Sequence, residues 1–322
     1  MLEPMLLKPC GKDYLWGGNR LKSEYSKQID LTPLAETWEC SVHPDGPSTV
    51  ASGSYKGQLL VDVLKEHPEY LGTKGIKHGT LPILIKFIDA EKDLSVQVHP
   101  DDEYARIHEN DNGKTEMWYV LDAKPGASLV SGFRHDITPK RLKEAVEKGD
   151  LMRYLNKTPV HKGDVFFIPP GTIHAIGAGI LVAEIQESSN VTYRVYDYNR
   201  VDKNGKKREL HFDKAVKVLN LKAGDAIRQA PRKVDYTWGC SRETLCRCSY
   251  FETVRIVCSM GCAFSVMENS FQVVLCTDGE GGLTTDQMAR PLRFKKGDCI
   301  FIPANTGRCH IIGKADLIKV RC

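Results

Sequence analysis

Four polar side chains from three separate segments could together hold a divalent cation. In DLSVQVHPDD, strand alternation places Gln97 and His99 on one face, and the same rule in GKTEMWYVL places Glu116 on a strand face. His174 follows a short apolar run that ends at Pro169. Such polar faces either contact solvent or point into a lined cavity. Two imidazole nitrogens and two side-chain oxygens suit Zn²⁺ first, with Mn²⁺, Fe²⁺ or Co²⁺ as alternatives.

The segment that precedes His174 occurs twice in the chain. KGDVFFIP at 162–169 recurs as KGDCIFIP at 296–303, and each copy continues to a Thr, a His and an apolar residue followed by Gly. Gly-Asp favours a turn, the apolar run favours a buried strand, and Pro ends that strand at the rim of a barrel. We therefore expect two copies of one β-unit, the first of which directs His174 into a cavity.

The rest of the chain also favours β-structure. Short runs of β-branched and aromatic residues, bounded by Gly, Pro and Asp, predict a mainly β fold with small helical insertions. Helical patterns occur at 57–71, 138–149 and 211–221. The second has Thr138 as N-cap, Pro139 at the first helical position and Gly149 as the stop.

Length and composition limit the organisation of the protein. A chain of 322 residues is long enough for about two domains. With the repeat, we predict a metal-binding catalytic domain at 1–225, with an N-terminal extension and a helical insertion at about 134–160, and a C-terminal domain at 226–322. The formal charge of +4 predicts no nucleic-acid partner. No segment resembles a signal peptide or a membrane span, so we expect a cytoplasmic protein. We also expect a monomer or a weak homo-oligomer.

Cysteine is concentrated late in the chain, since nine of the eleven cysteines follow residue 239. An odd number without a secretion signal argues against a disulfide framework, and the spacings do not fit a zinc ribbon. We expect free thiols that pack as small apolar residues. Cys246 and Cys248, on either side of Arg247, could be reactive if they are accessible.

These motifs resemble those of the type I mannose-6-phosphate isomerases, a family within the cupin superfamily, in its shorter bacterial form. The likeness to the family's metal-binding motifs lies in QVHPDD, KTEMWYVL and GDVFFIPPGTIHAIG. YLWGG, AETWECSVHPDGPS, LPILIKFIDA and TYRVYDYNR support it from the N-terminus to about residue 220. The resemblance implies two cupin, or jelly-roll-like, β-barrels. It also implies one zinc ion per chain, held by the same Gln97, His99, Glu116 and His174.

The resemblance assigns further roles by position. Lys114 and Arg194 match the family's active-site cations, and Ser95 matches the serine beside the substrate phosphate. Larger members read Lys-Pro-Glu where this chain has Lys-Thr-Glu ending at Glu116, which affects the local backbone rather than the roles. Glu184, in VAEIQES, is a candidate for substrate contact or for the base, and its alternative is a solvent-facing strand residue.

The implied activity is the interconversion of mannose 6-phosphate and fructose 6-phosphate through an enediol. The alternatives are another cupin metalloenzyme, such as an oxygenase or an epimerase, and a sugar-phosphate-binding module without catalysis. Lys114 and Arg194 together favour catalysis. After His211 the only histidine is His310, so we predict that the second barrel is a structural copy without a metal site.

Overall fold

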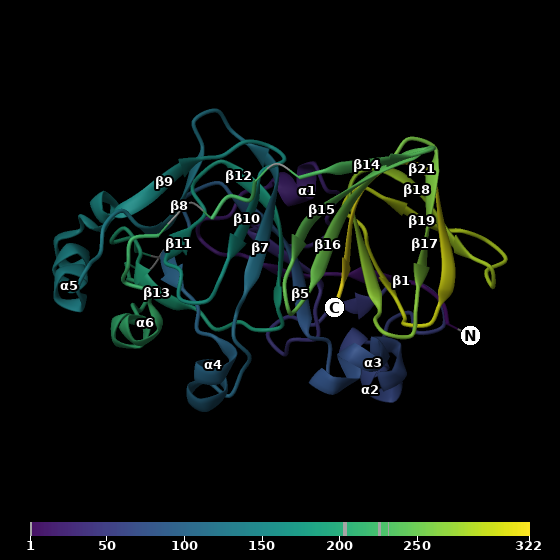
Figure 1. Cartoon of the computed structure of the whole chain (residues 1–322), viewed down its shortest axis with the longest axis horizontal. Helices are drawn as coiled ribbons and strands as arrows, with labels where there is room; N and C mark the ends of the chain where they lie inside the picture. The colour runs from purple at the N-terminus through teal and green to yellow at the C-terminus, as the bar shows by residue number, and fades with distance from the viewer. Residues whose placement is uncertain (1, 202–204, 225–226, 231) are drawn as a thin grey trace.

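The computed structural model describes residues 2–201, 205–224, 227–230 and 232–322. The predicted boundary between residues 225 and 226 lies outside these described residues. The protein consists mainly of antiparallel strands in three sheets, with short helices at the periphery (Figure 1). None of the sheets closes into a ring through the strand pairs of the described residues. A mainly β fold is therefore confirmed at the level of open, packed sheets.

A six-stranded sheet forms one wall of the N-terminal half, in the order β10-β7-β12-β5-β3-β2. Its strands are β2 (Cys10–Lys12), β3 (Glu36–Cys40), β5 (Ile83–Ala90), β7 (Glu116–Ala123), β10 (Val165–Ile168) and β12 (Ile180–Glu187). Strands β5 and β12 are buried along their whole length. Both strands are mostly apolar, with a few buried polar residues, which fits the centre of a sheet that is covered on both faces.

A five-stranded sheet packs against it, in the order β13-β6-β11-β8-β9. Its strands are β6 (Val96–Val98), β8 (Ser128–Phe133), β9 (Leu155–Pro159), β11 (His174–Ala175) and β13 (Tyr193–Tyr196). Val96 and Val98 are buried in one core cluster, as alternation predicts. Leu94 packs instead with Trp118 in a different cluster, because β6 begins only at Val96 and the alternation does not extend back to it.

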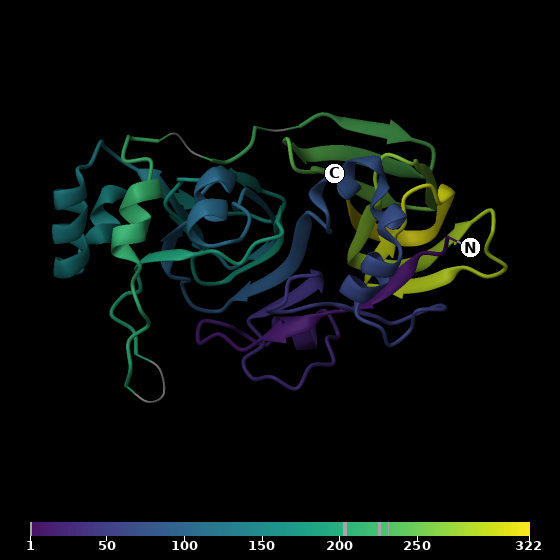
Figure 2. The same cartoon turned by 90° about the horizontal axis from the view of Figure 1, so that it is seen from below.

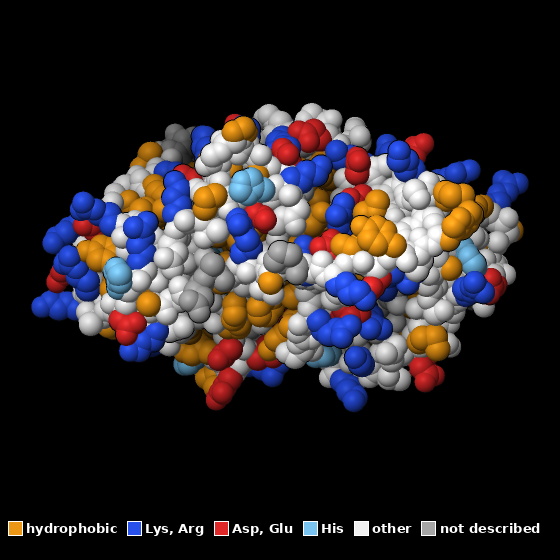
Figure 3. Space-filling model, turned by 45° about the horizontal axis from the view of Figure 1, so that its top comes forward, with side chains coloured by type: hydrophobic (Ala, Val, Ile, Leu, Met, Phe, Trp, Pro, Cys, Tyr) orange, Lys and Arg blue, Asp and Glu red, His pale blue; other side chains and the backbone are white. Residues whose placement is uncertain are grey.

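A ten-stranded sheet forms the C-terminal half and begins from β14 and β15. Its strands are β1 (Met5–Lys8), β4 (Thr49–Val50), β14 (Val234–Thr237), β15 (Cys240–Arg247), β16 (Glu252–Cys258), β17 (Gly261–Val266), β18 (Gln272–Thr285), β19 (Leu292–Lys295), β20 (Cys299–Ile302) and β21 (Gly307–Arg321). On the face drawn in Figure 3, lysine and arginine side chains alternate with acidic ones, in keeping with the small net charge of +4.

The N-terminal extension belongs to two sheets. Strand β1 pairs with β20, so that Met5 lies opposite Phe301, and β1 also pairs with β4. Figure 2 shows this first strand beside the last strands of the chain. Strands β2 and β3 join the six-stranded sheet instead. The extension therefore ties the two halves together, and the division into 1–225 and 226–322 stays a prediction.

The repeated segment has the same local structure in both copies. Gly163 and Gly297 both have positive φ, 90° and 94°, a conformation that favours glycine. The following aspartates make the same turn, since Asp164 accepts from His161 N and Asp298 from Lys295 N, each at 2.8 Å. The apolar runs are β10 and β20. The prediction of one β-unit in two copies is confirmed.

Helices are few and short. They are α1 (Arg20–Ser23), α2 (Leu60–Glu66), α3 (Gly72–Gly75), α4 (Asp102–His108), α5 (Pro139–Lys148) and α6 (Phe212–Val218), with 3₁₀ turns at Pro68–Leu71, Ile76–His78 and Leu151–Tyr154. None of the described helices combines the length and the apolar composition that a membrane span requires.

The three predicted helices differ in how well their limits were placed, and the one expected at 211–221 is the shorter α6. In α5, Thr138 accepts a hydrogen bond from Arg141 N and Gly149 is left-handed, as predicted. The pattern at 57–71 gives α2 and then a 3₁₀ turn that begins at Pro68, because proline cannot continue the hydrogen-bond ladder. Helix α4 was not predicted, although Asp101 caps it by accepting from Tyr104 N.

Met5→Ala is expected to lower the free energy of unfolding by about 2–5 kcal/mol, because the Met5 side chain is fully buried in β1. Lys8→Ala changes an exposed residue of the same strand and is expected to cost about 0.5 kcal/mol or less. Chemical denaturation of both variants measures the difference. Equal losses would mean that apolar burial does not hold β1 on the C-terminal sheet.

Candidate active site

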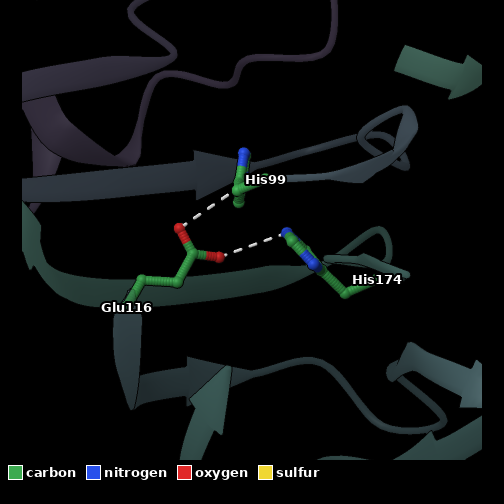
Figure 4. A group of neighbouring side chains, drawn as sticks. All are labelled: His99, Glu116 and His174. Atoms are coloured by element: carbon green, nitrogen blue, oxygen red, sulfur yellow. Dashed lines mark ion pairs between the residues drawn. The ribbon is translucent and has the colours of Figure 1, made fainter. Parts of the chain in front are cut away.

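Two histidines and a glutamate meet between the two N-terminal sheets. Candidate ligand atoms of His99, Glu116 and His174 all lie within 4.8 Å of one another. His174 Nε2 is 3.2 Å from Glu116 Oε1, and His99 Nε2 is 3.6 Å from Glu116 Oε2. Figure 4 shows the carboxylate between the two imidazoles. Glu116 begins β7 and His174 begins β11, so the packing of one sheet on the other sets these distances.

The backbone orients both imidazoles. His99 Nδ1 lies 2.9 Å from Val191 O, and His174 Nδ1 lies 2.9 Å from Thr172 O. A carbonyl oxygen only accepts hydrogen bonds, so each Nδ1 carries the proton and donates it. Each Nε2 then presents a lone pair toward Glu116. Histidine ligands of protein metal sites are commonly held in this way.

The charge states of the cluster also fit a cation. Burial and the nearby Lys114 ammonium lower the pKa of His99 well below its usual value, so its imidazole is neutral. Burial alone would raise the pKa of Glu116, but the Lys114 ammonium beside it holds that pKa well below the usual value. Neutral histidine and ionised carboxylate are the forms that bind metals. Both Glu116 oxygens are buried and accept no hydrogen bond of good geometry.

Gln97, the fourth predicted ligand, lies at the edge of this cluster. Its side-chain Nε2 is 3.4 Å from His174 Nε2, and Gln97 and His174 are directly paired between β6 and β11. The oxygen and nitrogen of an amide are interchangeable by a rotation about χ3. Gln97 can therefore turn an oxygen toward the position that the three other residues surround.

A cavity of about 250 Å³ contains the other predicted residues. Ser95, Gln97, Lys114, Glu184 and Arg194 all line it. Lys114 connects the cavity to the cluster, with its Nζ 2.7 Å from Glu116 Oε2 and 3.1 Å from His99 Nε2. All eight predicted site residues are thus brought to one place, with the cluster at one side of the cavity.

Glu184 does not face solvent. Only 3% of its surface is exposed, so the solvent-facing alternative is wrong. Its Oε2 accepts a hydrogen bond of 2.9 Å from Trp118 Nε1, and its Oε1 lies 3.1 Å from Lys86 Nζ. The carboxylate is therefore held in one orientation at the wall of the cavity.

Lys86 and Glu36 line the same cavity and were not predicted. Lys86 Nζ lies 3.8 Å from Glu36 Oε2, which accepts 2.8 Å from Trp38 Nε1. Burial opposes the charged form of Lys86, but Glu184 and Glu36 raise its pKa above the usual value. One sequence signal could have pointed to it, because Lys86 is a basic residue in the otherwise apolar start of LPILIKFIDA.

These residues form a row across four strands. Trp118 of β7 pairs with Glu184 of β12, Glu184 pairs with Lys86 of β5, and Lys86 pairs with Trp38 of β3. Direct cross-strand neighbours lie about 4.5–5.5 Å apart. The register of the six-stranded sheet therefore places Glu184 and Lys86 side by side in the cavity wall, with a tryptophan at each end of the row.

Arginines form another part of the cavity. Arg208, which was not predicted, lines it beside Arg194 and is held by Asp197 through hydrogen bonds of 2.8 and 2.6 Å. Arg194 donates 2.8 Å to Glu209 O, while its buried Nε has no hydrogen-bond partner. Burial and Arg208 lower the pKa of Arg194, but an arginine stays protonated at neutral pH. This part of the cavity suits an anionic group.

The C-terminal sheet has no comparable centre among the described residues. His310 is partly exposed, and its nearest acidic partner, Asp286, lies 4.0 Å away. His99, Glu116 and His174 are the only group of three candidate ligands found in the described part of the chain. That the second copy is structural, without a metal site, stays a prediction.

Lys86→Met is expected to lower the free energy of unfolding at pH 7 by about 3–5 kcal/mol, because Glu184 and Glu36 would remain buried without a cation. Lys65→Met, on the exposed face of α2, is expected to change it by about 0.5 kcal/mol or less. Urea denaturation followed by circular dichroism compares the two. A loss for Lys86→Met as small as that of the control would contradict the buried ion-pair network.

Comparisons with known proteins identify the family. Residues 5–146 match the family described as "Phosphomannose isomerase type I, catalytic domain", and residues 242–322 match "Mannose-6-phosphate isomerase, cupin domain". The chain is 36% identical to mannose-6-phosphate isomerase ManA of Bacillus subtilis, over 98% of each chain. It is 37% identical to the mannose-6-phosphate isomerase of Streptococcus mutans, over 99% of this chain and 98% of that one.

Solved structures agree with these relatives. The crystal structure of the mannose 6-phosphate isomerase from Bacillus subtilis superposes with a TM-score of 0.91 at 34% identity, over 98% of this chain and 99% of that one. A putative mannosephosphate isomerase from Archaeoglobus fulgidus shares the fold, with a TM-score of 0.78 at 22% identity, over 99% and 98%. With these identities over nearly its whole length, the chain belongs to the type I mannose-6-phosphate isomerase family.

Proposed function

We propose that the chain interconverts mannose 6-phosphate and fructose 6-phosphate in the 250 Å³ cavity, through an enediol. The observation that carries this function is the joint placement of a buried metal-ligand set and several cations around one cavity. The relatives named as mannose-6-phosphate isomerases, which match over nearly the full chain, support the substrate. A binding module without catalysis would not need Lys114 beside the ligand set.

We propose that His99, Glu116 and His174, with Gln97 as a fourth ligand, hold one Zn²⁺ per chain. Neutral imidazoles and a carboxylate suit zinc better than the all-oxygen ligands that magnesium and calcium prefer. A bound divalent cation would polarise the carbonyl of the open-chain sugar. The four side chains leave a side of the cluster open to the cavity, where Lys114 and Gln97 form part of the lining.

The cations of the cavity suit the anionic parts of the reaction. Arg194 presents a buried Nε without a partner, and a guanidinium binds phosphate or enediolate oxygens through paired hydrogen bonds. Ser95 lines the same cavity, and its hydroxyl can donate to the phosphate. We propose that Lys114 donates to an enediolate oxygen, because it is the cation nearest the ligand set. A preorganised donor of this kind stabilises charge that develops in the transition state.

Glu184 is proposed as a substrate contact. Both of its carboxylate oxygens already have partners, Trp118 and Lys86, which fixes the carboxylate against the wall of the cavity. A fixed acceptor of this kind suits a sugar hydroxyl. Lys86 supports this role, because its ammonium balances the charge of the buried Glu184 carboxylate.

Finer features of the protein are proposed on the same basis. Two jelly-roll-like units, divided at about residue 225, fit the match of residues 242–322 to a cupin domain. In this division β1 crosses from the first unit into the sheet of the second. A cytoplasmic location and a monomeric or weakly homo-oligomeric state complete the proposal.

Chelation is expected to abolish isomerisation in an assay that couples fructose 6-phosphate formation to a dehydrogenase, and Zn²⁺ is expected to restore it. Metal analysis of the purified protein is expected to give one equivalent per chain. Glu116→Gln should lose most of this metal, because an amide replaces the charged ligand. His310→Ala is the matched control and should keep it. Two equivalents per chain, or activity that survives chelation, would contradict the proposed centre.

Arg194→Ala is expected to lower kcat/KM for mannose 6-phosphate by about 10- to 100-fold, the usual value of one lost hydrogen bond to a charged group. Arg141→Ala removes an exposed arginine of α5 that pairs with Glu144 and should leave kcat/KM unchanged. Steady-state kinetics of the two variants, with circular dichroism as a check on folding, compares them. Wild-type kinetics for Arg194→Ala would exclude the role given to this residue.

A further inference from the structure

A second cavity, of about 310 Å³, lies at the C-terminus of the chain. Two thiols, Cys248 and Cys322, line it together with Lys74, Arg247 and Arg321. Cys248 follows β15, Cys322 follows β21, and Lys74 belongs to α3. In both cartoon views the C-terminus lies close to α3 (Figures 1 and 2). This cavity shares no residue with the candidate active site.

The lining of this cavity is net positive. Glu252, which also lines it, pairs with both Arg247 and Arg321, the latter at 2.8 Å. Among the described residues Lys74 has no ion-pair partner. Three cations therefore stand against two carboxylates, those of Glu252 and of the last residue, Cys322, which leaves the lining positive by one charge. The cavity favours an anionic ligand, and Ser249 and Asn269 add hydrogen-bonding groups to it.

Cys248 is the thiol that this environment activates. The residue is partly exposed and lies in the turn between β15 and β16. A hydrogen bond with the Cys246 thiol, together with backbone hydrogen bonds to Phe251 and Tyr250, lowers the pKa of Cys248 to about 6, although burial opposes this. The thiolate is the nucleophilic form of cysteine.

The neighbouring thiols are less reactive. The contact with Cys248 and burial raise the pKa of Cys246 above its usual value. Burial raises the pKa of Cys322 to about 12 and that of Cys276 to about 12. These groups stay protonated at neutral pH. Cys246 is then a slow attacking group toward any disulfide formed at Cys248.

We propose that Cys248 is a thiolation site that forms a mixed disulfide with low-mass disulfides carrying carboxylates. The Cys248 thiolate attacks one sulfur of the reagent R–S–S–R, so that the bond Cys248–S–S–R forms and the S–S bond of the reagent breaks. The second half of the reagent leaves as the thiolate RS⁻ with the electron pair. The reagent is the oxidant, and no further co-reactant is needed. The carboxylates of the adduct lie against Lys74 and the two arginines.

The test compares two disulfide reagents of opposite charge on the native full-length protein. Oxidised glutathione carries carboxylates, whereas cystamine is cationic. Intact mass spectrometry should detect one adduct per chain, and peptide mapping should place it on Cys248. After correction for the rates with free cysteine, oxidised glutathione should react faster than cystamine. Lys74→Glu should lower the rate with oxidised glutathione by about 5-fold and raise that with cystamine, because the charge of the lining is reversed at one position.

Matched variants make the test specific. Cys248→Ser should lose the adduct, and Cys276→Ser, which removes a buried thiol outside the cavity, should keep it. Both variants should retain isomerase activity, since neither residue lines the active-site cavity. If Cys248→Ser fails to fold, the peptide map of the unaltered chain still identifies the modified residue. Cys262 is a partly exposed thiol outside the cavity, and a hydrogen bond with Cys258 lowers its pKa as well. An adduct on Cys262 or Cys322, or equal corrected rates for the two reagents, would overturn the proposal.

Discussion

The buried carboxylate of Glu116 is the constraint on which the rest of the site depends. An ionised group without access to water costs several kcal/mol unless partners of suitable charge and geometry surround it. Here the Lys114 ammonium lies beside the carboxylate, and His174 on the opposite wall would share a bound cation with it. The packing that holds the two sheets together therefore also holds the chemical groups of the site at their working distances. Any shift that separates the sheets also leaves this charge without partners.

The same logic extends along the six-stranded sheet. Lys86 stands between Glu184 and Glu36, and tryptophans close the row at both ends. Each tryptophan N–H donates to one carboxylate, and the lysine ammonium balances the charge of both. The cavity wall is therefore polar yet rigid. A rigid wall of this kind suits a small, highly hydroxylated substrate, because donors and acceptors stay where the sugar needs them.

Local patterns in the sequence were sufficient for part of this arrangement. Alternation brought Gln97 and His99 to one face, and the repeat located β10 and β20. The pairing of Lys86 with Glu184 could not be predicted in this way, because it depends on the order of strands that are far apart in the chain. Strand order follows from the packing of the whole sheet, to which a single segment contributes little. Strand limits were a second difficulty. Alternation places Leu94 on the same face as Val96 and Val98, but Leu94 packs elsewhere because it precedes β6.

The pairing of β1 with β20 has a consequence for how the protein is made. Met5 is synthesised before its partner Phe301, which is added nearly 300 residues later. At about 5–20 residues per second, roughly 15–60 s pass between the synthesis of β1 and that of its partner strand. During that time its apolar side chains have no sheet to enter and are open to chaperones or to aggregation. The C-terminal sheet is therefore complete only when two segments that lie nearly 300 residues apart in the chain have both been made and paired.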